Sequence, residues 1–418
     1  MIVGRYNERR PPVKGKNLNI RVALFFDGTA NNKYNVMEGD RKSGAGNLYD
    51  LLRLQCGSYR SGQSNVARMY ELYRTGEIDG YTVKAFYVEG VATSPRGAAY
   101  NIGGFDSLIG AATGMGSRGI FASAKRGYKM ILGMLRELHG RYSLRTKITV
   151  DNLKVDIFGF SRGAAAARVF CNKLHDDYGA FKGESYTVKR IQPEFMGLFD
   201  TVSAYGLSIS AFVKNVEKLP LKVSWPLQTV HFVAADEIRE LFALTRIKSA
   251  RAGSKELIIP GSHSDIGGSY RDYRHEGYSY CGKSNEVLVK EGWKREPDDI
   301  GRVVRSEFSL IVMAYMIKLL NAFRKRSMIT VIPDISCLPR PVSGFRRILF
   351  KLDKNPLYLF EYDPYAKRDV VVENRNHPFH GSNELRELRY GFLHLSASGK
   401  IGMRASANGK RIIIDDNI

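Results

Sequence analysis

A serine flanked by glycines is the clearest chemical signal in this sequence. Ser161 stands in the run Gly159-Phe160-Ser161-Arg162-Gly163, between an apolar run and the alanine-rich residues 164–167. This strand, turn and helix pattern with G-x-S-x-G spacing is typical of a turn that exposes a nucleophilic hydroxyl. We expect Gly159 and Gly163 to be required there because a side chain would strike a neighbouring strand or helix. The alternative is an ordinary strand-to-helix turn with a solvent-facing serine.

The same turn predicts donors for a developing oxyanion. The N–H of Arg162, the residue after the serine, lies at the positive end of the predicted helix. A second donor is expected from the loop after an early strand, and Gly28 or Thr29 fits that place. Both residues lie in the polar turn that follows the apolar run 19–26.

An activated serine also needs a base and an acid that orients the base. The order serine, acid, histidine is that of the α/β-hydrolases, and this chain offers it with each candidate at a predicted strand end. His263, in a glycine-rich loop, is the predicted base. Asp200 is the favoured acid and Asp236 the alternative. Glu237 and Arg239 suit a structural ion pair beside Asp236, which favours Asp200.

Strands alternate with helices over residues 20–270, which predicts an α/β fold with a mostly parallel sheet covered on both faces. The expected strands are 19–26, 81–88, 148–158, 194–199, 228–234 and 257–259, and the expected helices in this part are 65–74 and 120–139. Residues 33–62 are expected to be loop. A further helix over 303–323 is apolar nearly all round, which favours burial over contact with a membrane.

These elements suggest three parts. Residues 1–19 form a basic, flexible N-terminus, 20–300 an α/β-hydrolase-like catalytic domain, and 301–418 a C-terminal accessory region packed on it. Aromatic and basic residues interleave over 340–370, which suits either a membrane-facing surface or a solvated basic face with core aromatics. The G-x-G-x-x-G run at 114–119 lacks a preceding strand and a following acid, so it indicates a flexible loop or lid.

Composition limits the partners. The formal net charge is +22, which attracts polyanions such as nucleic acid or an anionic membrane surface. No nucleic-acid-binding motif accompanies this charge. No run of 18 apolar residues predicts a membrane span, and the N-terminus has no signal-peptide pattern. The four cysteines show no C-x-x-C pair, which indicates a reducing compartment and no zinc site.

Eight sequence blocks carry a resemblance to a known family. In chain order they read "FFDGTANN", "SNVARMYELY", "YVEGVAT", "GFSRGAAAAR", "GLFDTVSAYG", "HFVAADEIRELF", "PGSHSDIGGSY" and "GFLHLSAS". Together they resemble the α/β-hydrolase lipase effectors of bacterial type VI secretion that carry a GFSRG elbow. The resemblance covers about 25–270 and touches the C-terminal part through one block.

The resemblance implies a phospholipase of the A type that cleaves fatty-acyl esters of membrane phospholipids, with Ser161 as nucleophile, Asp200 as acid and His263 as base. No cofactor is predicted; Ca²⁺ stays open but is not indicated by the residues. The implied partners are a phospholipid membrane surface, a spike protein or adaptor of the secretion system and a cognate immunity protein, with no nucleic acid. It also implies synthesis in the cytoplasm without a signal peptide and action at the periplasm or membrane of a target cell.

Two other functions stay open from the residues. The first is a serine esterase that acts on a soluble ester or thioester. The second is a basic nucleic-acid-binding or interaction protein on a hydrolase fold, which the charge alone suggests. Serine, aspartate and histidine in the hydrolase order argue against the second.

Overall fold

The computed structural model describes most of the 418-residue chain. The described residues are 18–29, 31–42, 62–91, 93, 119–142, 147–177, 181–182, 185–203, 219–271, 273–279, 281–330, 338–397, 404–406 and 410–416. The predicted loop or lid over 101–119, with its G-x-G-x-x-G run, lies outside these residues apart from Gly119, as does the N-terminus up to residue 17.

A seven-stranded sheet forms the centre of the structure, in the order β2-β3-β1-β4-β5-β6-β8. Six strands are parallel, and β2 is antiparallel at one edge. The strands are β1 (Leu18–Phe26), β2 (Gly76–Ile78), β3 (Tyr81–Val88), β4 (Ile148–Phe160), β5 (Tyr186–Phe199), β6 (Gln228–Ala234) and β8 (Lys255–Ile259). The carboxyl ends of the parallel strands therefore meet at one edge, which is where open α/β sheets bind their ligands.

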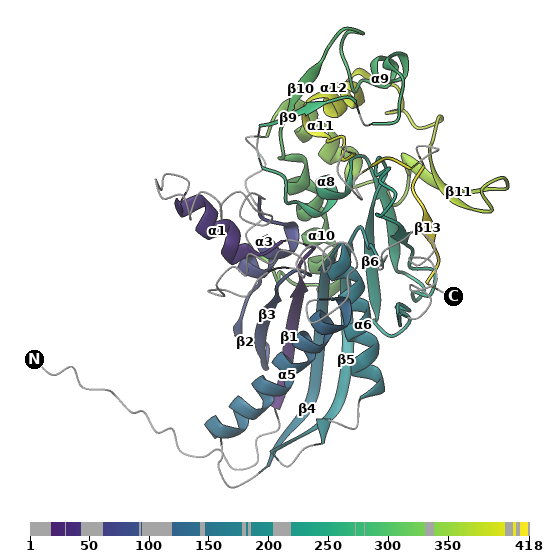
Figure 1. Ribbon diagram of the computed structural model, residues 1–418. Coiled ribbons are helices and arrows are strands. Elements are labelled where there is room, and N and C mark those ends of the chain that lie inside the picture. The colour runs from purple at the N-terminus through teal and green to yellow at the C-terminus, as the bar shows by residue number, and fades with distance from the viewer. Residues whose placement is uncertain are drawn as a thin grey trace, which may run out of the picture.

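Helices cover both faces of the sheet, as predicted (Figure 1). The helices α5 (Ile120–Tyr142) and α6 (Arg162–Asp176) bury their apolar side chains on one face, whereas α3 (Asn65–Leu72) and α10 (Phe308–Arg324) do so on the other. Alternate residues of β4 enter opposite cores, with Ile157 on the α5 and α6 side and Phe158 on the other. The last six residues of β4, 155–160, are all buried, and they are apolar apart from Asp156, as expected where both faces of a strand are covered.

Strand β5 is longer than predicted and starts eight residues before residue 194, at Tyr186. Pro193 interrupts the pattern because proline has no N–H for the ladder. The structure accommodates it where the pairing of β4 with β5 shifts register between Val155 and Asp156, and β6 pairs with β5 only from Phe195 onward.

The apolar helix α10 is buried in the core, as the sequence favoured. Its last residue, Arg324, also enters the sheet side of this core. There the guanidinium bonds the carboxylates of Asp156 and Glu194, and Arg21 donates to Glu194 at 2.9 Å. This buried ion cluster joins α10 to β1, β4 and β5.

The remaining elements lie mostly beyond the carboxyl ends of the strands and beside the sheet (Figure 1). They are α1 (Lys33–Lys42), β7 (Leu244–Thr245), α8 (His263–Gly267), β9 (Arg274–Gly277), α9 (Asn285–Glu291), β10 (Gly301–Val304), α11 (Arg340–Leu349), β11 (Tyr358–Asp363), β12 (Arg368–Glu373), α12 (Asn383–Phe392) and β13 (Ile413–Ile414). Helix α1 lies where a loop was predicted over 33–62, so that prediction is wrong for its first ten residues.

The aromatic residues of 340–370 divide between the core and the surface. Phe345 and Tyr358 are buried, and Phe345 packs on Phe308 and Phe379. These rings are therefore not available to a membrane. Tyr362 and Tyr365, at the end of the β11–β12 hairpin, are exposed. Among the described residues, no helix has the length and apolar character needed to span a bilayer.

Candidate functional site

Ser161 lies on a strained turn between β4 and α6. Its backbone has φ 59° and ψ −129°, a conformation rare for any residue other than glycine. Its N–H donates to the carbonyl of Phe199 at 3.0 Å, and its own carbonyl accepts from Val202 at 3.2 Å. The turn is therefore fastened on both sides to the end of the neighbouring strand β5, and Ser161 itself is 4% exposed.

The two glycines of the turn lie where no side chain fits. A Cβ at Gly159 would stand 2.5 Å from the Cα of Ala164 in α6, and a Cβ at Gly163 would stand 2.2 Å from the carbonyl oxygen of Asp27. Both neighbours are backbone atoms, which cannot move aside as a flexible side chain can. The close packing of α6 on β4 and on the end of β1 thus depends on these positions.

Asp200 and His263 meet at the same edge of the sheet. The Nδ1 atom of His263 lies 2.5 Å from Oδ2 of Asp200, and both side chains are buried. Asp200 follows β5 directly, with a positive φ of 45°, and its Oδ1 accepts from the N–H of Ala234 at 2.9 Å. A carboxylate on Nδ1 leaves Nε2 as the basic nitrogen of the neutral ring.

The ring of His263 packs on Phe160, the residue that precedes Ser161, and this contact brings His263 to the serine turn. The centroids of the two rings lie 4.6 Å apart. The ring of Phe242 meets the same imidazole edge-on at 5.0 Å. Two aromatic rings thus hold the imidazole at the end of β4, next to the serine.

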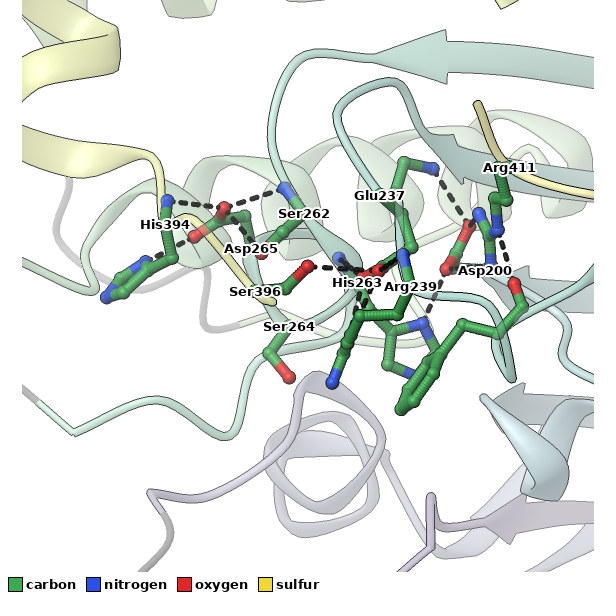
Figure 2. Close-up of polar contacts among 12 residues, drawn as sticks. Asp200, Glu237, Arg239, Ser262, His263, Ser264, Asp265, His394, Ser396 and Arg411 are labelled. Carbon is green, nitrogen blue, oxygen red and sulfur yellow. Dashed lines mark hydrogen bonds and ion pairs between the residues drawn. The ribbon is translucent and has the colours of Figure 1, made fainter. Parts of the chain in front are cut away.

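Arg411 is a residue of this site that sequence reasoning missed. Its guanidinium donates to both oxygens of Asp200, at 2.6 Å and 2.7 Å, and to the carbonyl of Phe242 (Figure 2). The backbone beside it is held because Leu244 donates to Ile412 at 2.8 Å and β13 pairs with β7. No local signal at residue 411 could have revealed this contact, because it depends on the path of the chain 211 residues after Asp200.

The charges around the dyad set its protonation. Burial acts to raise the pKa of Asp200, but the charge of Arg411 and the hydrogen bonds of His263 outweigh it and lower this pKa well below its usual range. Burial lowers the pKa of His263 below its ordinary value, against the opposing effect of Asp200. Near neutral pH the site therefore holds an ionised carboxylate and a neutral imidazole.

His263 stands on the first turn of the short helix α8, whereas the sequence predicted a freely adjustable loop. Ser262 and Asp265 form a capping box, and Asp265 also accepts from Nδ1 of His394 at 2.6 Å. The N–H of His263 donates to Glu237, which Arg239 also binds at 2.8 Å (Figure 2). The histidine backbone is thus held by two buried carboxylates, and Glu237 and Arg239 form the predicted ion pair.

The predicted oxyanion donors differ in whether their N–H groups already have a hydrogen-bond partner. The N–H of Gly28 donates to Oδ1 of Asp27 at 2.7 Å in this structure, and its role as an oxyanion donor stays a prediction. Tyr87 donates to the other oxygen of Asp27, and burial raises the pKa of this carboxyl against those hydrogen bonds. Thr29 and Arg162 also remain predicted donors. The first N–H groups of a helix such as α6 have no partner within the helix.

Asp236, the alternative acid, lies apart from His263. Its Oδ2 accepts from the N–H of Gly261 at 2.7 Å, and its pKa is raised by burial. It borders a cavity of about 210 Å³ that is lined by charged side chains, among them Lys283, Glu373 and Arg389. Within the described residues, no group of three or more His, Cys, Asp or Glu side chains is placed to hold a metal ion.

Comparison with known proteins bears on part of this site. Residues 172–318 match the model of a family described as the catalytic domain of Tle1-like phospholipase effectors of the type VI secretion system. This stretch contains Asp200 and His263 and begins after Ser161. The resemblance named from the sequence is confirmed there.

Solved structures show a similar fold. A structure of the Tle1 effector bound to the VgrG spike of the type VI secretion system is 18% identical, with a TM-score of 0.60 over 96% of this chain and 94% of that one. An uncharacterized protein from Pseudomonas aeruginosa is 21% identical, with a TM-score of 0.43 over 81% of this chain and 52% of that one. Curated proteins gave no match.

Proposed function

We propose that this chain, which resembles the type VI phospholipase effectors, is a serine-dependent phospholipase that cleaves fatty-acyl esters of membrane phospholipids. Ser161 is the nucleophile, His263 the general base and Asp200 the acid that orients it. The observation that carries the proposal is the 2.5 Å contact between Asp200 and the Nδ1 atom of His263, beside a serine in a strained strand-to-helix turn.

In the first half of the reaction, Nε2 of His263 takes the proton of the Ser161 hydroxyl as Oγ attacks the ester carbonyl. The tetrahedral oxyanion accepts hydrogen bonds from the N–H groups of Arg162 and Thr29. Asp200 stabilises the imidazolium by Coulomb attraction and holds its tautomer. The imidazolium then protonates the leaving oxygen, so the lysophospholipid departs and an acyl-serine remains.

In the second half, water replaces the lysophospholipid. Nε2 of His263 takes a proton from the water, whose oxygen attacks the acyl carbonyl. The second tetrahedral intermediate collapses, the proton returns to Ser161, and the fatty acid is released. The sum is one ester and one water consumed, and one fatty acid and one lysophospholipid formed.

The cellular setting is proposed with the activity. The charge of +22 favours approach to an anionic bilayer, where each basic residue near the surface contributes about 1 kcal/mol. We propose delivery by a type VI spike protein, action on the membrane of a target cell and neutralisation by an immunity protein in the producer. The family match and the spike-bound relative of similar fold support this setting.

The direct test is mass spectrometry of defined phospholipid vesicles incubated with the wild type and with Ser161→Ala. We expect the wild type to release fatty acid and lysophospholipid. The alanine variant, which keeps the fold, should bind vesicles equally and release neither product. Retention of most of the lipase rate by Ser161→Ala would show that another residue is the nucleophile.

A soluble-ester esterase is distinguished by the physical state of the substrate. A phospholipase should speed up sharply when a short-chain phospholipid passes from monomers to micelles or vesicles. Turnover that follows monomer concentration, with no increase at the transition, would favour the soluble-ester alternative and leave the serine chemistry intact.

A further inference from the structure

Arg162 is a partly buried cation for which the described residues supply no counter-charge. It is the first residue of α6 and follows Ser161 directly. Its Nη1 atom is buried and has no hydrogen-bond partner in the part of the chain that the structure describes. Burial lowers the pKa of this guanidinium to about 10, and no neighbouring carboxylate opposes that shift.

Most other buried and partly buried arginines of the described residues have acceptors. Arg239 binds Glu237, Arg411 binds Asp200, and Arg324 binds Asp156 and Glu194. The same holds for Arg302 with Glu276, Arg389 with Glu373, Arg246 with Glu256 and Asp369, and Arg168, which donates to the carbonyls of Thr245 and Arg246. Arg368, which is also partly buried, has an unpartnered Nε atom like the unpartnered Nη1 of Arg162, so the feature that distinguishes Arg162 is its position directly after Ser161.

A polar nitrogen that is buried without a hydrogen-bond partner destabilises the protein. Strongly perturbed groups of this kind cluster at functional sites, where a bound ligand can supply the missing charge. Arg162 adjoins the proposed nucleophile, so an anion that neutralises it would have to be part of the substrate. The side chain of an arginine is long enough to reach a group several bonds away from the carbonyl that Ser161 attacks.

We propose that the Arg162 guanidinium binds the phosphodiester of the phospholipid substrate while the N–H of the same residue faces the oxyanion. This inference rests on the proposed function. In a glycerophospholipid the phosphodiester is the fixed anion on the same glycerol as the acyl esters. Arginine binds phosphate through two parallel hydrogen bonds, which adds geometric selection to charge. Arg162 thereby selects phospholipids over neutral glycerides.

The test compares two lipids with the same acyl chains, a phosphatidylcholine and a diacylglycerol, each in mixed micelles. For Arg162→Gln we expect kcat/KM on the phospholipid to fall about 30-fold or more, the loss typical of removing one member of a buried charge pair. The rate on the diacylglycerol should change less than about threefold. Arg136→Gln, which removes an exposed charge of α5, is the matched control and should leave both rates unchanged.

A second measurement needs no bilayer. Glycerophosphocholine, a soluble phosphodiester, should compete with hydrolysis of a water-soluble butyrate ester in the wild type and not in Arg162→Gln. Inorganic phosphate and oleate serve as parallel arms. If oleate alone inhibits the wild type and no longer inhibits Arg162→Gln, Arg162 binds the fatty-acid carboxylate. That result would overturn the proposal.

Stability separates a ligand-binding arginine from a structural one. Because Arg162 has no partner to lose, Arg162→Gln should unfold at the same or a higher denaturant concentration than the wild type. A clear decrease, or equal losses on both lipids, would overturn the proposal. If the wild type cleaves neither lipid, the proposed function fails instead, so the two failures are distinguishable.

Discussion

At the scale of single residues, the carboxylate of Asp200 is the most constrained group of the site. It accepts from the N–H of Ala234, from two nitrogens of Arg411 and from Nδ1 of His263. These four donors, which come from three separate segments, fix its position. The carboxylate that accepts from Nδ1 of His263 is therefore held in place by other residues. A fixed acceptor of this kind keeps the proton on Nδ1 and so holds one tautomer of the ring.

The two candidate acids should respond very differently to amide substitution. In Asp200→Asn the amide can present N–H to Nδ1, which favours the wrong tautomer of His263, so kcat should fall on the order of 10⁴-fold. In Asp236→Asn the amide oxygen can still accept from Gly261, and the rate should stay within a few-fold. The measurement is kcat on a soluble ester for both variants, and similar mild losses would show that neither aspartate orients the base.

Arg411 should set the pH range of the reaction. The charged groups that face His263 are Asp200 with its partner Arg411, and Glu237 with its partner Arg239. Because burial lowers the pKa of His263 below 6.5, the wild type should keep its activity as pH falls through 6.5. Removing Arg411 leaves the charge of Asp200 uncompensated, which stabilises the imidazolium and raises this pKa.

For Arg411→Gln we therefore expect the acidic limb of the kcat/KM profile to move to higher pH, with a lower plateau because Asp200 loses two donors. Arg411→Lys keeps the positive charge but cannot donate to both oxygens of Asp200 in parallel. Compared with Arg411→Gln, it should bring the acidic limb of the kcat/KM profile back toward its wild-type pH more fully than it brings back the plateau value of kcat/KM. A profile for Arg411→Gln that superimposes on that of the wild type would show that the arginine serves stability alone.

At the scale of elements, the elbow works through close backbone packing. Helix α6 approaches the end of β1 so closely that a Cβ at Gly163 would stand 2.2 Å and 2.4 Å from the carbonyl oxygens of Asp27 and Phe26. Neither oxygen lies on a flexible side chain. The Ser161 turn can therefore keep its position against the neighbouring strands only if residue 163 has no side chain.

Gly163→Ala should lower both stability and activity. The methyl group must push α6 away from β1, which costs about 1–3 kcal/mol for overpacking and displaces the serine. Gly133→Ala is the matched control, because Gly133 lies within α5 and a Cβ there would meet no atom within 4 Å. That change should stabilise the helix by about 0.5–1 kcal/mol. Chemical denaturation and kcat measure both effects, and equal behaviour of the two variants would contradict this account.

At the scale of the whole molecule, the C-terminal region is part of the α/β body. Helix α10 shares its core with β4, β5 and β6, and the segment before β13 places Arg411 on the carboxylate of Asp200. Residues 393–396 also bind the site, because His394 donates to Asp265 and Ser396 donates to Glu237. The division at residue 300 stays a prediction about chain organisation, while these contacts join the two parts at the site.

The ion cluster at the end of α10 should be a main determinant of stability. In Arg324→Met, the carboxylates of Asp156 and Glu194 lose a buried counter-charge, which typically costs about 3–5 kcal/mol. Arg295→Met, which breaks the exposed pair with Glu387, is the control and should cost much less. The measurement is the denaturant midpoint of unfolding. A loss for Arg324→Met no larger than that of the control would show that the cluster adds little.

Most of the sheet was predictable from the residues alone. Largely apolar runs bounded by polar turns identified β1, β3, β4 and β6 nearly to their ends, because strands buried on both faces are rich in apolar residues. The alternation with helices predicted the parallel order, and parallel order by itself brings the ends of the strands to one edge. That is why Ser161, Asp200 and His263 could be named before any coordinates.

Only the tertiary structure decided what surrounds those three residues. The clearest case is the pairing of Arg411 with Asp200, which joins distant segments of the chain. The engagement of the Gly28 N–H by Asp27 and the unpartnered Nη1 atom of Arg162 could likewise be seen only in the folded chain. A sequence displays the periodicity of its own local elements, but it does not display which side chain from another element fills a given space. The local pattern therefore determined the scaffold and the proposed reacting groups, and the packing of the whole chain decided their charge environment.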